Sequence, residues 1–256
     1  MDILLYILAV LPGLLICAYI YWLDRNEREH WSPLLICFGF GMLITFPAIW
    51  LQQIGTDWGL TEDGNFLQLL GSAFMMVAFS EELLKFLVLM LIPYPRNFFN
   101  EPMDGIVYSV MIGMGFATLE NIFHGMIYGI EVVVFRDFTA VPAHAVFAVF
   151  MGFFVGLAKF EKKYKYHLIA TGLITAIVVH GLYDFFILQG YFEWLMLLAI
   201  VILIASIFMS RQLIRIHQQY AIANNSLTSE DTVVGNDVMD AVIDDLESEE
   251  DPIDNE

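Results

Sequence analysis

Seven long apolar runs are the feature of this sequence that most constrains its fold. Each run approaches or exceeds the roughly 20 residues that an α-helix needs to cross a bilayer. They cover residues 3–23, 32–54, 66–92, 104–130, 141–158, 167–188 and 191–210. Charged residues make up 16% of the chain, whereas about a quarter is usual in soluble domains. The sequence therefore predicts an all-α protein, a polytopic transmembrane helix bundle of about seven spans in a lipid bilayer.

Basic residues gather in alternate connections between these runs. The first, third, fifth and last connections carry nine of them, namely Arg25, Arg28, Arg96, Lys159, Lys162, Lys163, Lys165, Arg211 and Arg215. The other connections carry only Arg136. Because lysine and arginine are enriched in the cytoplasmic loops of membrane proteins, we expect the N-terminus outside and the C-terminus inside the cell.

Acidic residues gather at the C-terminal end of the chain. The formal charge is −18, twelve of the 29 acids lie in residues 230–256, and no lysine or arginine follows Arg215. A segment this acidic buries too little apolar surface to fold alone. We therefore predict a transmembrane domain over residues 1–215 and an acidic, disordered cytoplasmic tail over residues 216–256. No basic patch indicates nucleic-acid binding.

The third run contains three charges in the segment "SEELLK", namely Glu81, Glu82 and Lys85. An unpaired charge inside a bilayer costs at least several kcal/mol, so such residues are usually paired or functional. The lysine follows the two glutamates by four and three positions, so it can reach either carboxylate along one helix face. One glutamate remains in excess, and a structural ion pair alone does not explain it.

Other ionisable residues continue faces of small residues in the later runs. Small residues recur every four positions in the fourth, fifth and sixth runs, and Glu120, His144, His180 and Asp184 lie on or beside these ridges. Because membrane helices pack closely through small residues, we expect these side chains to point at neighbouring helices. At 1.5 Å per residue they converge in the outer half of the membrane. His124, one turn beyond Glu120, is expected nearer the interface.

Two polar residues at the ends of the runs have structural interpretations. Asp104 follows "EP" where the fourth run begins, a position typical of a helix N-cap, with a contact to Tyr108 as the alternative. His217 follows the last run and is expected to be solvated at the cytoplasmic boundary.

Carboxylates and imidazoles without a serine or cysteine nucleophile favour hydrolysis by activated water. A glutamate can act as a general base, and an imidazole can stabilise an oxyanion or protonate a leaving amine. The set Glu81, Glu120, His144 and His180 can also hold zinc, which prefers histidine and carboxylate ligands. The helical zinc motif H-E-x-x-H is absent, so metal-free and zinc-dependent chemistry both remain open.

Five motifs, taken in order, resemble those of the PrsW family of intramembrane proteases. They are "EELLK", "EPMDGIVYS", "GFATLEN", the isolated His144 and "HGLYD", and they extend over residues 80–184. The pattern is more distantly similar to the clan of CAAX prenyl proteases and bacteriocin-processing enzymes. The resemblance implies that Glu81 activates water with support from Glu82, and that His180 and Asp184 help to stabilise the oxyanion.

Two departures from the wider clan concern the residues around this pair. Lys85 stands where the clan has an arginine at a longer spacing, and Phe116-x-x-x-Glu120 replaces a Phe-x-x-x-His motif, so that His144 can supply the missing imidazole. Lys85, Phe116 and Asn121 are expected to support the site. The clan is best interpreted as using glutamate rather than a metal for catalysis. No cofactor is therefore favoured, and zinc is the open alternative.

The resemblance also implies a substrate and a place in the cell. The substrate would be a single-span membrane protein, typically an anti-sigma factor, cut near its extracytoplasmic side in regulated proteolysis at the bacterial cytoplasmic membrane. The alternative function is a proton- or cation-coupled transporter, which also buries ionisable residues. The sequence shows no inverted repeat of the kind that many transporters have.

Overall fold

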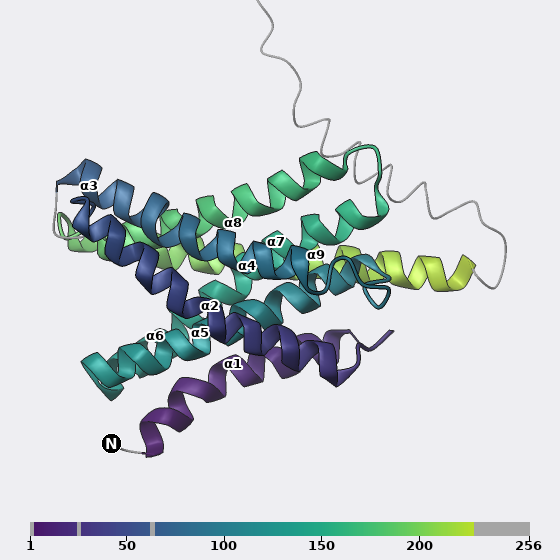
Figure 1. Cartoon of the computed structure of the whole chain (residues 1–256), viewed down its shortest axis with the longest axis horizontal. Coiled ribbons are helices and arrows are strands. Elements are labelled where there is room, and N and C mark those ends of the chain that lie inside the picture. The colour runs from purple at the N-terminus through teal and green to yellow at the C-terminus, as the bar shows by residue number, and fades with distance from the viewer. Residues whose placement is uncertain (1–2, 25–26, 62–64, 228–256) are drawn as a thin grey trace, which may run out of the picture.

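The computed structural model describes residues 3–24, 27–61 and 65–227. These residues form a bundle of helices with short connections, and they contain no strand (Figure 1). The all-α prediction is confirmed. Arg25 and residues 228–256, which make up most of the expected acidic tail, lie outside the described residues.

The helices follow the apolar runs closely. Their bounds are α1 (Ile3–Leu23), α2 (Trp31–Asp57), α3 (Phe66–Gly71), η1 (Ser72–Ala78), α4 (Phe79–Leu91), α5 (Pro102–Tyr128), α6 (Ile130–Phe138), α7 (Ala140–Phe160), α8 (Lys165–Leu188), η2 (Glu193–Leu195) and α9 (Met196–Leu227). Six helical stretches among the described residues are long and apolar enough to cross a membrane. Helices α3, η1 and α4 follow one another without a break and together form the remaining expected span.

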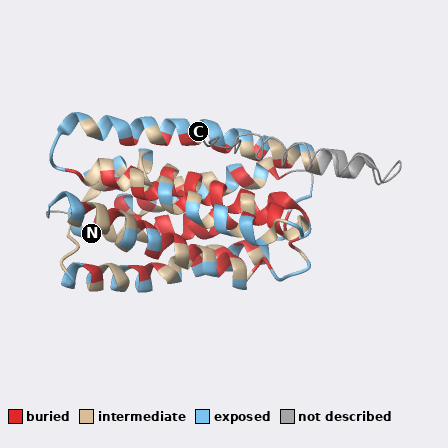
Figure 2. Ribbon diagram, turned by 90° about the horizontal axis from the view of Figure 1, so that it is seen from above, coloured by how far each residue is buried: buried red, intermediate tan, exposed pale blue. Residues whose placement is uncertain are grey.

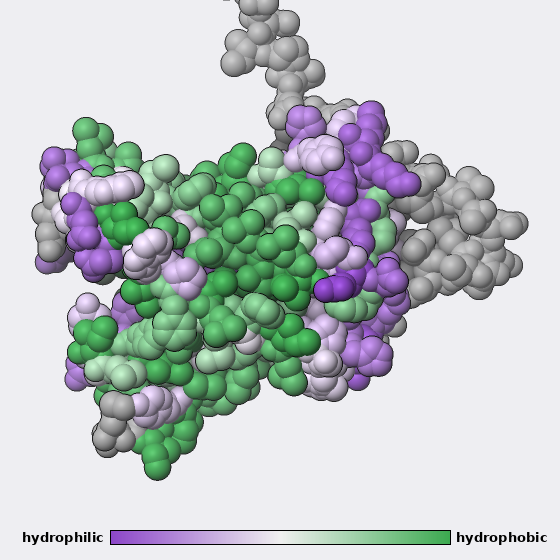
Figure 3. Space-filling view, viewed as in Figure 1, coloured by the Kyte–Doolittle hydropathy of each residue, from purple (hydrophilic) through white to green (hydrophobic). Residues whose placement is uncertain are grey.

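The surface of the bundle is that of a membrane protein. Large apolar side chains such as Leu35, Trp50 and Val201 are exposed on its outer helices. Figure 3 shows a broad apolar band across the middle of the visible face, with polar residues gathered toward the two ends. Buried residues lie mainly in the middle of the bundle (Figure 2). The apolar band is the surface that lipid tails cover, since exposed apolar area on this scale is not stable in water.

Helices α5 and α7 pack with their backbones in contact. A Cβ atom added to Gly152 of α7 would lie 2.3 Å from the carbonyl oxygen of Gly105 in α5. A Cβ atom on Gly105 would lie 2.2 Å from the carbonyl oxygen of Gly152. Only glycine permits this approach, which confirms the interpretation of the small-residue ridges. The close packing brings Glu120 of α5 beside His144 of α7.

A π-helical segment, η1, precedes the charged motif in the third span. A π turn holds more residues than an α turn, so it changes the face that the following residues present. The segment packs against α8, because a Cβ atom on Gly181 would lie 2.5 Å from the ring of Phe74. Ser80 donates hydrogen bonds to the carbonyl oxygens of Met76 and Val77. The π segment thus sets the position of α4 relative to α8.

Helix α6 lies in a stretch that the sequence presented as a simple connection. It begins after Gly129, whose φ angle of 90° breaks the helix, and it ends before Thr139. Val133 is fully buried against Leu5 and Ala9 of α1. This contact holds α6 against α1, and Arg136 of α6 reaches Glu120 of α5.

The last helix is longer than expected. α9 continues to Leu227, so the proposed boundary at residue 216 falls within a helix, and the disordered tail stays a prediction. His217 is wholly buried, with its ring stacked on Phe153 at 4.4 Å between centroids. The expectation that His217 is solvated is wrong, because α9 packs this face on α7 and α5.

Side-chain hydrogen bonds cap the N-terminus of α5. The carboxylate of Asp104 accepts hydrogen bonds from the backbone N–H groups of Asn100 at 2.7 Å and Glu101 at 2.9 Å. These bonds fix the turn that leads into the helix. The N-cap position itself is Glu101, and Asp104 lies at N3, so the predicted N-cap position of Asp104 is wrong although its carboxylate does cap the helix start. The alternative contact with Tyr108 is not formed, because Tyr108 donates its hydrogen bond to Glu29.

Buried acids meet at this end of the bundle. Burial, followed by the charge of Glu101, raises the pKa of Asp24 to about 8. Burial, followed by the charge of Glu27, raises the pKa of Glu101 to about 7. Both carboxylate oxygens of Asp24 are buried without a hydrogen-bond donor among the described residues. These acids therefore take up protons near neutral pH.

Candidate active site

The three charges of α4 form the middle of the site. The Nζ atom of Lys85 lies 2.8 Å from Oε1 of Glu82 and 3.3 Å from Oε2 of Glu81. All three residues are buried. The i,i+3 and i,i+4 spacing of the motif produces this arrangement, as expected from the sequence.

Two histidines from other helices turn their Nδ1 atoms toward this group. Nδ1 of His144, on α7, lies 3.2 Å from Nζ of Lys85. Nδ1 of His180, on α8, lies 2.9 Å from Oε1 of Glu82. The imidazole rings stand edge to face at 5.3 Å between centroids, and Phe147 stacks on His180 at 4.5 Å. Helices α4, α7 and α8 thus bring two carboxylates and two imidazoles together.

Each histidine also contacts an outer carboxylate through its other nitrogen. Nε2 of His144 lies 3.0 Å from Glu120, and Nε2 of His180 lies 3.1 Å from Asp184. Since an ammonium group only donates, His144 accepts from Lys85 at Nδ1 and carries its proton at Nε2, facing Glu120. His180 faces carboxylate oxygens at both nitrogens, an arrangement that favours the doubly protonated ring.

An arginine that the sequence did not assign to the site holds the outer carboxylate. Nη2 of Arg136, on α6, lies 2.6 Å from Oε2 of Glu120, and its Nε donates to Asn121 at 3.2 Å. Asn121 in turn donates to Asp137 at 2.8 Å. His124 lies 3.5 Å from Glu120 and lines the cavity described below. His124 therefore borders the site with a side chain that is 35% exposed, and its expected position near the interface stays a prediction.

The sequence did contain a signal for Arg136, because it is the one basic residue in the connections that departs from the alternating charge pattern. Gln52 of α2 gave no such signal, yet its amide donates to Oε1 of Glu81 at 2.9 Å. Phe116, expected to support the site, places its ring centroid 4.2 Å from Nζ of Lys85. Gln52 and Phe116 thus hold the charged group from two sides.

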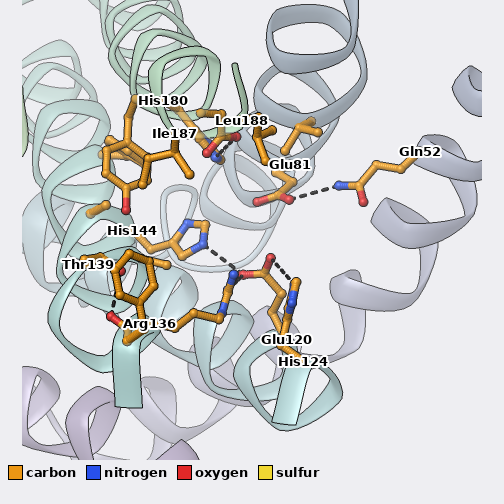
Figure 4. Close-up of a pocket in the computed structure, with 17 residues that line it drawn as sticks. Gln52, Glu81, Glu120, His124, Arg136, Thr139, His144, His180, Ile187 and Leu188 are labelled. Atoms are coloured by element: carbon orange, nitrogen blue, oxygen red, sulfur yellow. Dashed lines mark hydrogen bonds and ion pairs between the residues drawn. The ribbon is translucent and has the colours of Figure 1, made fainter. Parts of the chain in front are cut away.

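These groups border a cavity of about 220 Å³, shown in Figure 4. Its polar wall is formed by Gln52, Glu81, Glu120, His124, Arg136, His144, His180 and Asp184. Glu82 and Lys85 do not line it. Glu81 is therefore the carboxylate of the pair that faces the cavity, whereas Glu82 lies behind it between Lys85 and His180.

The structure brings all six expected catalytic residues into one connected network. Glu81, Glu82, His144 and His180 form its centre. Glu120 and Asp184 bind the outer nitrogens of the histidines. Asn121 lies one step farther out, bound to Arg136 and Asp137.

The chain is similar in sequence to known proteins. The family model described as "PrsW family intramembrane metalloprotease" matches residues 29–209. The chain belongs to the PrsW family. Protease PrsW of Geobacillus kaustophilus (strain HTA426) is 38% identical over 196 residues, which cover 75% of this chain and 84% of the relative. Protease PrsW of Bacillus subtilis (strain 168) is 33% identical over 187 residues, 73% of this chain and 83% of the relative.

Protease PrsW of Clostridioides difficile (strain 630) is 30% identical over 210 residues, which cover 78% of this chain and 85% of the relative. A search of solved structures gives no match. Membership of the PrsW family makes the chain a membrane-embedded peptidase, and the transporter alternative is set aside. It also makes the chain a multi-pass membrane protein, which in bacteria belongs to the cell membrane.

The family description as a metalloprotease favours the metal-dependent alternative over the metal-free one. Each of Glu81, Glu82, His144 and His180 offers one ligand atom, and these atoms all lie within 4.8 Å of one another. Oε2 of Glu82 is buried without a hydrogen-bond partner among the described atoms, and histidine and carboxylate are the donors that zinc prefers. The donor set fits zinc. It differs from the expected set because Glu82 replaces Glu120.

Glu120 and Asp184 would contact the histidine ligands of such a metal rather than the metal itself. Histidine ligands of metals usually donate their second N–H to a carboxylate or carbonyl, which fixes the ring and its tautomer. Glu120 and Asp184 contact the second nitrogens of His144 and His180 in this way. They are therefore placed to orient the two rings.

Proposed function

We propose that this PrsW-family chain hydrolyses a peptide bond of a single-span membrane protein, such as an anti-sigma factor, near the extracytoplasmic side of that protein. The observation that carries the proposal is the position of Glu81. Its carboxylate borders a cavity that two imidazoles also line, and each imidazole is held by an outer carboxylate. A base and acids around one cavity are the requirements for peptide hydrolysis by water.

The distribution of the site along the helices supports an outward-facing cut. His144 lies four residues from the start of α7, whereas Lys159 lies at its other end, beside a cluster of basic residues. Because basic loops favour the cytoplasmic side, the end with Lys159 is assigned to the cytoplasm. The cavity then lies toward the extracytoplasmic side of the membrane.

Most polar groups of the cavity have a role in the proposed reaction. Glu81 accepts a proton from the attacking water as a general base. The amide of Gln52 donates to Oε1 of Glu81 and so orients the carboxylate. Without a bound metal, His180, held between Glu82 and Asp184, donates to the oxygen on which negative charge develops or protonates the leaving amine.

The four central residues would hold a divalent metal when one is bound. The chemistry that a metal supplies in such a site is Lewis-acid polarisation of the scissile carbonyl group and activation of water. Glu120 and Asp184 orient the rings of His144 and His180, which keeps their Nδ1 atoms directed at the centre. Arg136 in turn holds Glu120 in place.

The test is reconstitution with a panel of single-span membrane proteins that carry a tag at each end. Wild-type protein should release a fragment whose mass places the cut within a few residues of the extracytoplasmic end of the span. His180→Ala should lower the rate by about 10²-fold or more. A cut at the cytoplasmic end, or full cleavage by His180→Ala, would contradict the proposal.

A further inference from the structure

The ammonium group of Lys85 lies among the donor atoms that fit a metal. Its Nζ atom is 2.8 Å from Glu82, 3.3 Å from Glu81 and 3.2 Å from Nδ1 of His144. These are three of the four residues whose ligand atoms converge. The Lys85 side chain is 4% exposed, so water does not screen it from the group.

A divalent metal and this ammonium group conflict in two ways. First, the Nδ1 lone pair of His144 accepts a hydrogen bond from Lys85, and the same lone pair is the one that would bind a metal ion. Second, two like charges a few ångströms apart repel strongly where water is excluded. The ammonium group and the metal therefore cannot share the centre in this arrangement.

We infer that Lys85 and a divalent metal ion are alternative occupants of the centre formed by Glu81, Glu82, His144 and His180. In the metal-free chain, Lys85 bridges the two carboxylates and keeps the ligand residues together. The lysine side chain is flexible, so its ammonium group can leave while the helix stays in place. Binding of metal displaces Lys85, and the lysine thereby weakens the affinity of the site for metal.

The inference rests on the ligand set of the proposed function but not on cleavage of any substrate. The experiment measures zinc affinity of the purified, full-length protein in detergent by competition with a chromophoric chelator. Lys85→Met should bind zinc at least about 10-fold more tightly than the wild type. Lys85→Gln should shift affinity in the same direction, because it also removes the charge while remaining polar.

The matched control is Lys159→Met. Lys159 donates to the carbonyl oxygens of Tyr94 and Arg96 at the other end of α7, so its loss should leave zinc affinity unchanged. The double variant Glu82→Gln with Lys85→Met should not show the increase in zinc affinity expected for Lys85→Met, since it removes one ligand of the centre.

A second measurement separates this role from a structural ion pair. Lys85→Met removes the ammonium group that contacts both buried carboxylates, so its thermal midpoint in a chelating buffer should be lower than that of the wild type. Zinc should raise the midpoint of Lys85→Met by more than it raises the midpoints of the wild type and Lys159→Met. If Lys85 were only a structural ion-pair partner, Lys85→Met would have a lower thermal midpoint, and zinc would not restore it.

Three results would overturn the inference. They are equal zinc affinities for the wild type, Lys85→Met and Lys85→Gln, the absence of zinc binding by all three, or a thermal midpoint of Lys85→Met that does not respond to zinc. If Lys85→Met does not fold, the affinity of Lys85→Gln decides alone. His180-dependent cleavage by the wild type together with any of these results would refute the inference and leave the proposed function standing.

Discussion

Replacing Arg136 tests whether helix α6 takes part in the site. Nη2 of Arg136 lies 2.6 Å from Glu120, its Nε lies 3.2 Å from Asn121, and the side chains of the ion pair are 14% and 18% exposed. A charge-assisted hydrogen bond contributes about 1.5–3 kcal/mol and a neutral one about 1 kcal/mol. Breaking a fully buried pair costs about 3–5 kcal/mol, and this pair retains some contact with solvent. We therefore expect Arg136→Gln to lower the free energy of unfolding by about 2–4 kcal/mol.

The same change should reduce activity through His144. Glu120 accepts a hydrogen bond from Nε2 of His144. Removing a hydrogen-bond partner of this kind lowers metal affinity or rate by about 10–100-fold. Arg136→Lys restores the charge but loses the bond to Asn121, so it should recover part of both losses. The assays are thermal unfolding in detergent and cleavage of the single-span substrate. The exposed Arg96 provides the control, since Arg96→Gln should change stability by less than about 0.5 kcal/mol.

A double-mutant cycle decides whether the two residues act as a pair. If Arg136 acts through Glu120, the double change with Glu120→Gln should cost less than the sum of the two single changes, with a coupling of about 1–3 kcal/mol. Strictly additive losses would refute this explanation. So would an Arg136→Gln protein with wild-type stability and rate.

Three other predictions concern the bundle around the site. Asp24 and Glu101 have folded-state pKa values of about 8 and about 7, raised from ordinary values of 3.8 and 4.5. Between its ordinary and its folded-state pKa, each group lowers the free energy of unfolding by about 1.4 kcal/mol per pH unit, and above the folded-state pKa the loss is complete. The thermal midpoint should therefore fall as the pH rises from about 4.5 to about 8, and Asp24→Asn should flatten the fall, whereas an unchanged slope would contradict the prediction. Gly152→Ala should lower the free energy of unfolding by about 1–3 kcal/mol because its Cβ would lie 2.3 Å from a carbonyl oxygen. Gly39→Ala is the control and should cause no loss, because a Cβ atom there meets open space. Equal thermal midpoints for the two variants would argue against the α5–α7 contact. A reporter fused after Lys163 should be cytoplasmic and one inserted in residues 57–64 external, and finding both on one side would refute the proposed orientation.

The bundle and the centre of the site follow from local patterns in the sequence. Apolar runs of membrane-spanning length fixed the helices, and the i,i+3 and i,i+4 spacing of "EELLK" fixed the pairing of Lys85. Four-residue ridges of small residues correctly indicated that Glu120, His144 and His180 point inward, because only small residues allow the backbone contact at Gly152.

Other features depend on contacts between distant segments and leave little local trace. Gln52 reaches Glu81 across 29 residues of sequence, and a pair of adjacent glutamines near the end of an apolar run has no helical periodicity that would single out one of them. The π segment arises where α4 must face both α2 and α8. The burial of His217 depends on the length of α9. Arg136 is the exception, since it already departed from the charge pattern and then proved to bind Glu120.

The most direct test of the central claim is the rate at which Glu81→Gln cleaves a single-span substrate that the wild type cuts. Glutamine keeps the shape of the side chain but cannot accept the proton of the attacking water. Glu193→Gln, the same change at an exposed acid outside the cavity, is the control and should retain the wild-type rate. The account predicts a fall of at least about 10²-fold for Glu81→Gln with unchanged membrane insertion. Cleavage by Glu81→Gln at the wild-type rate would contradict it.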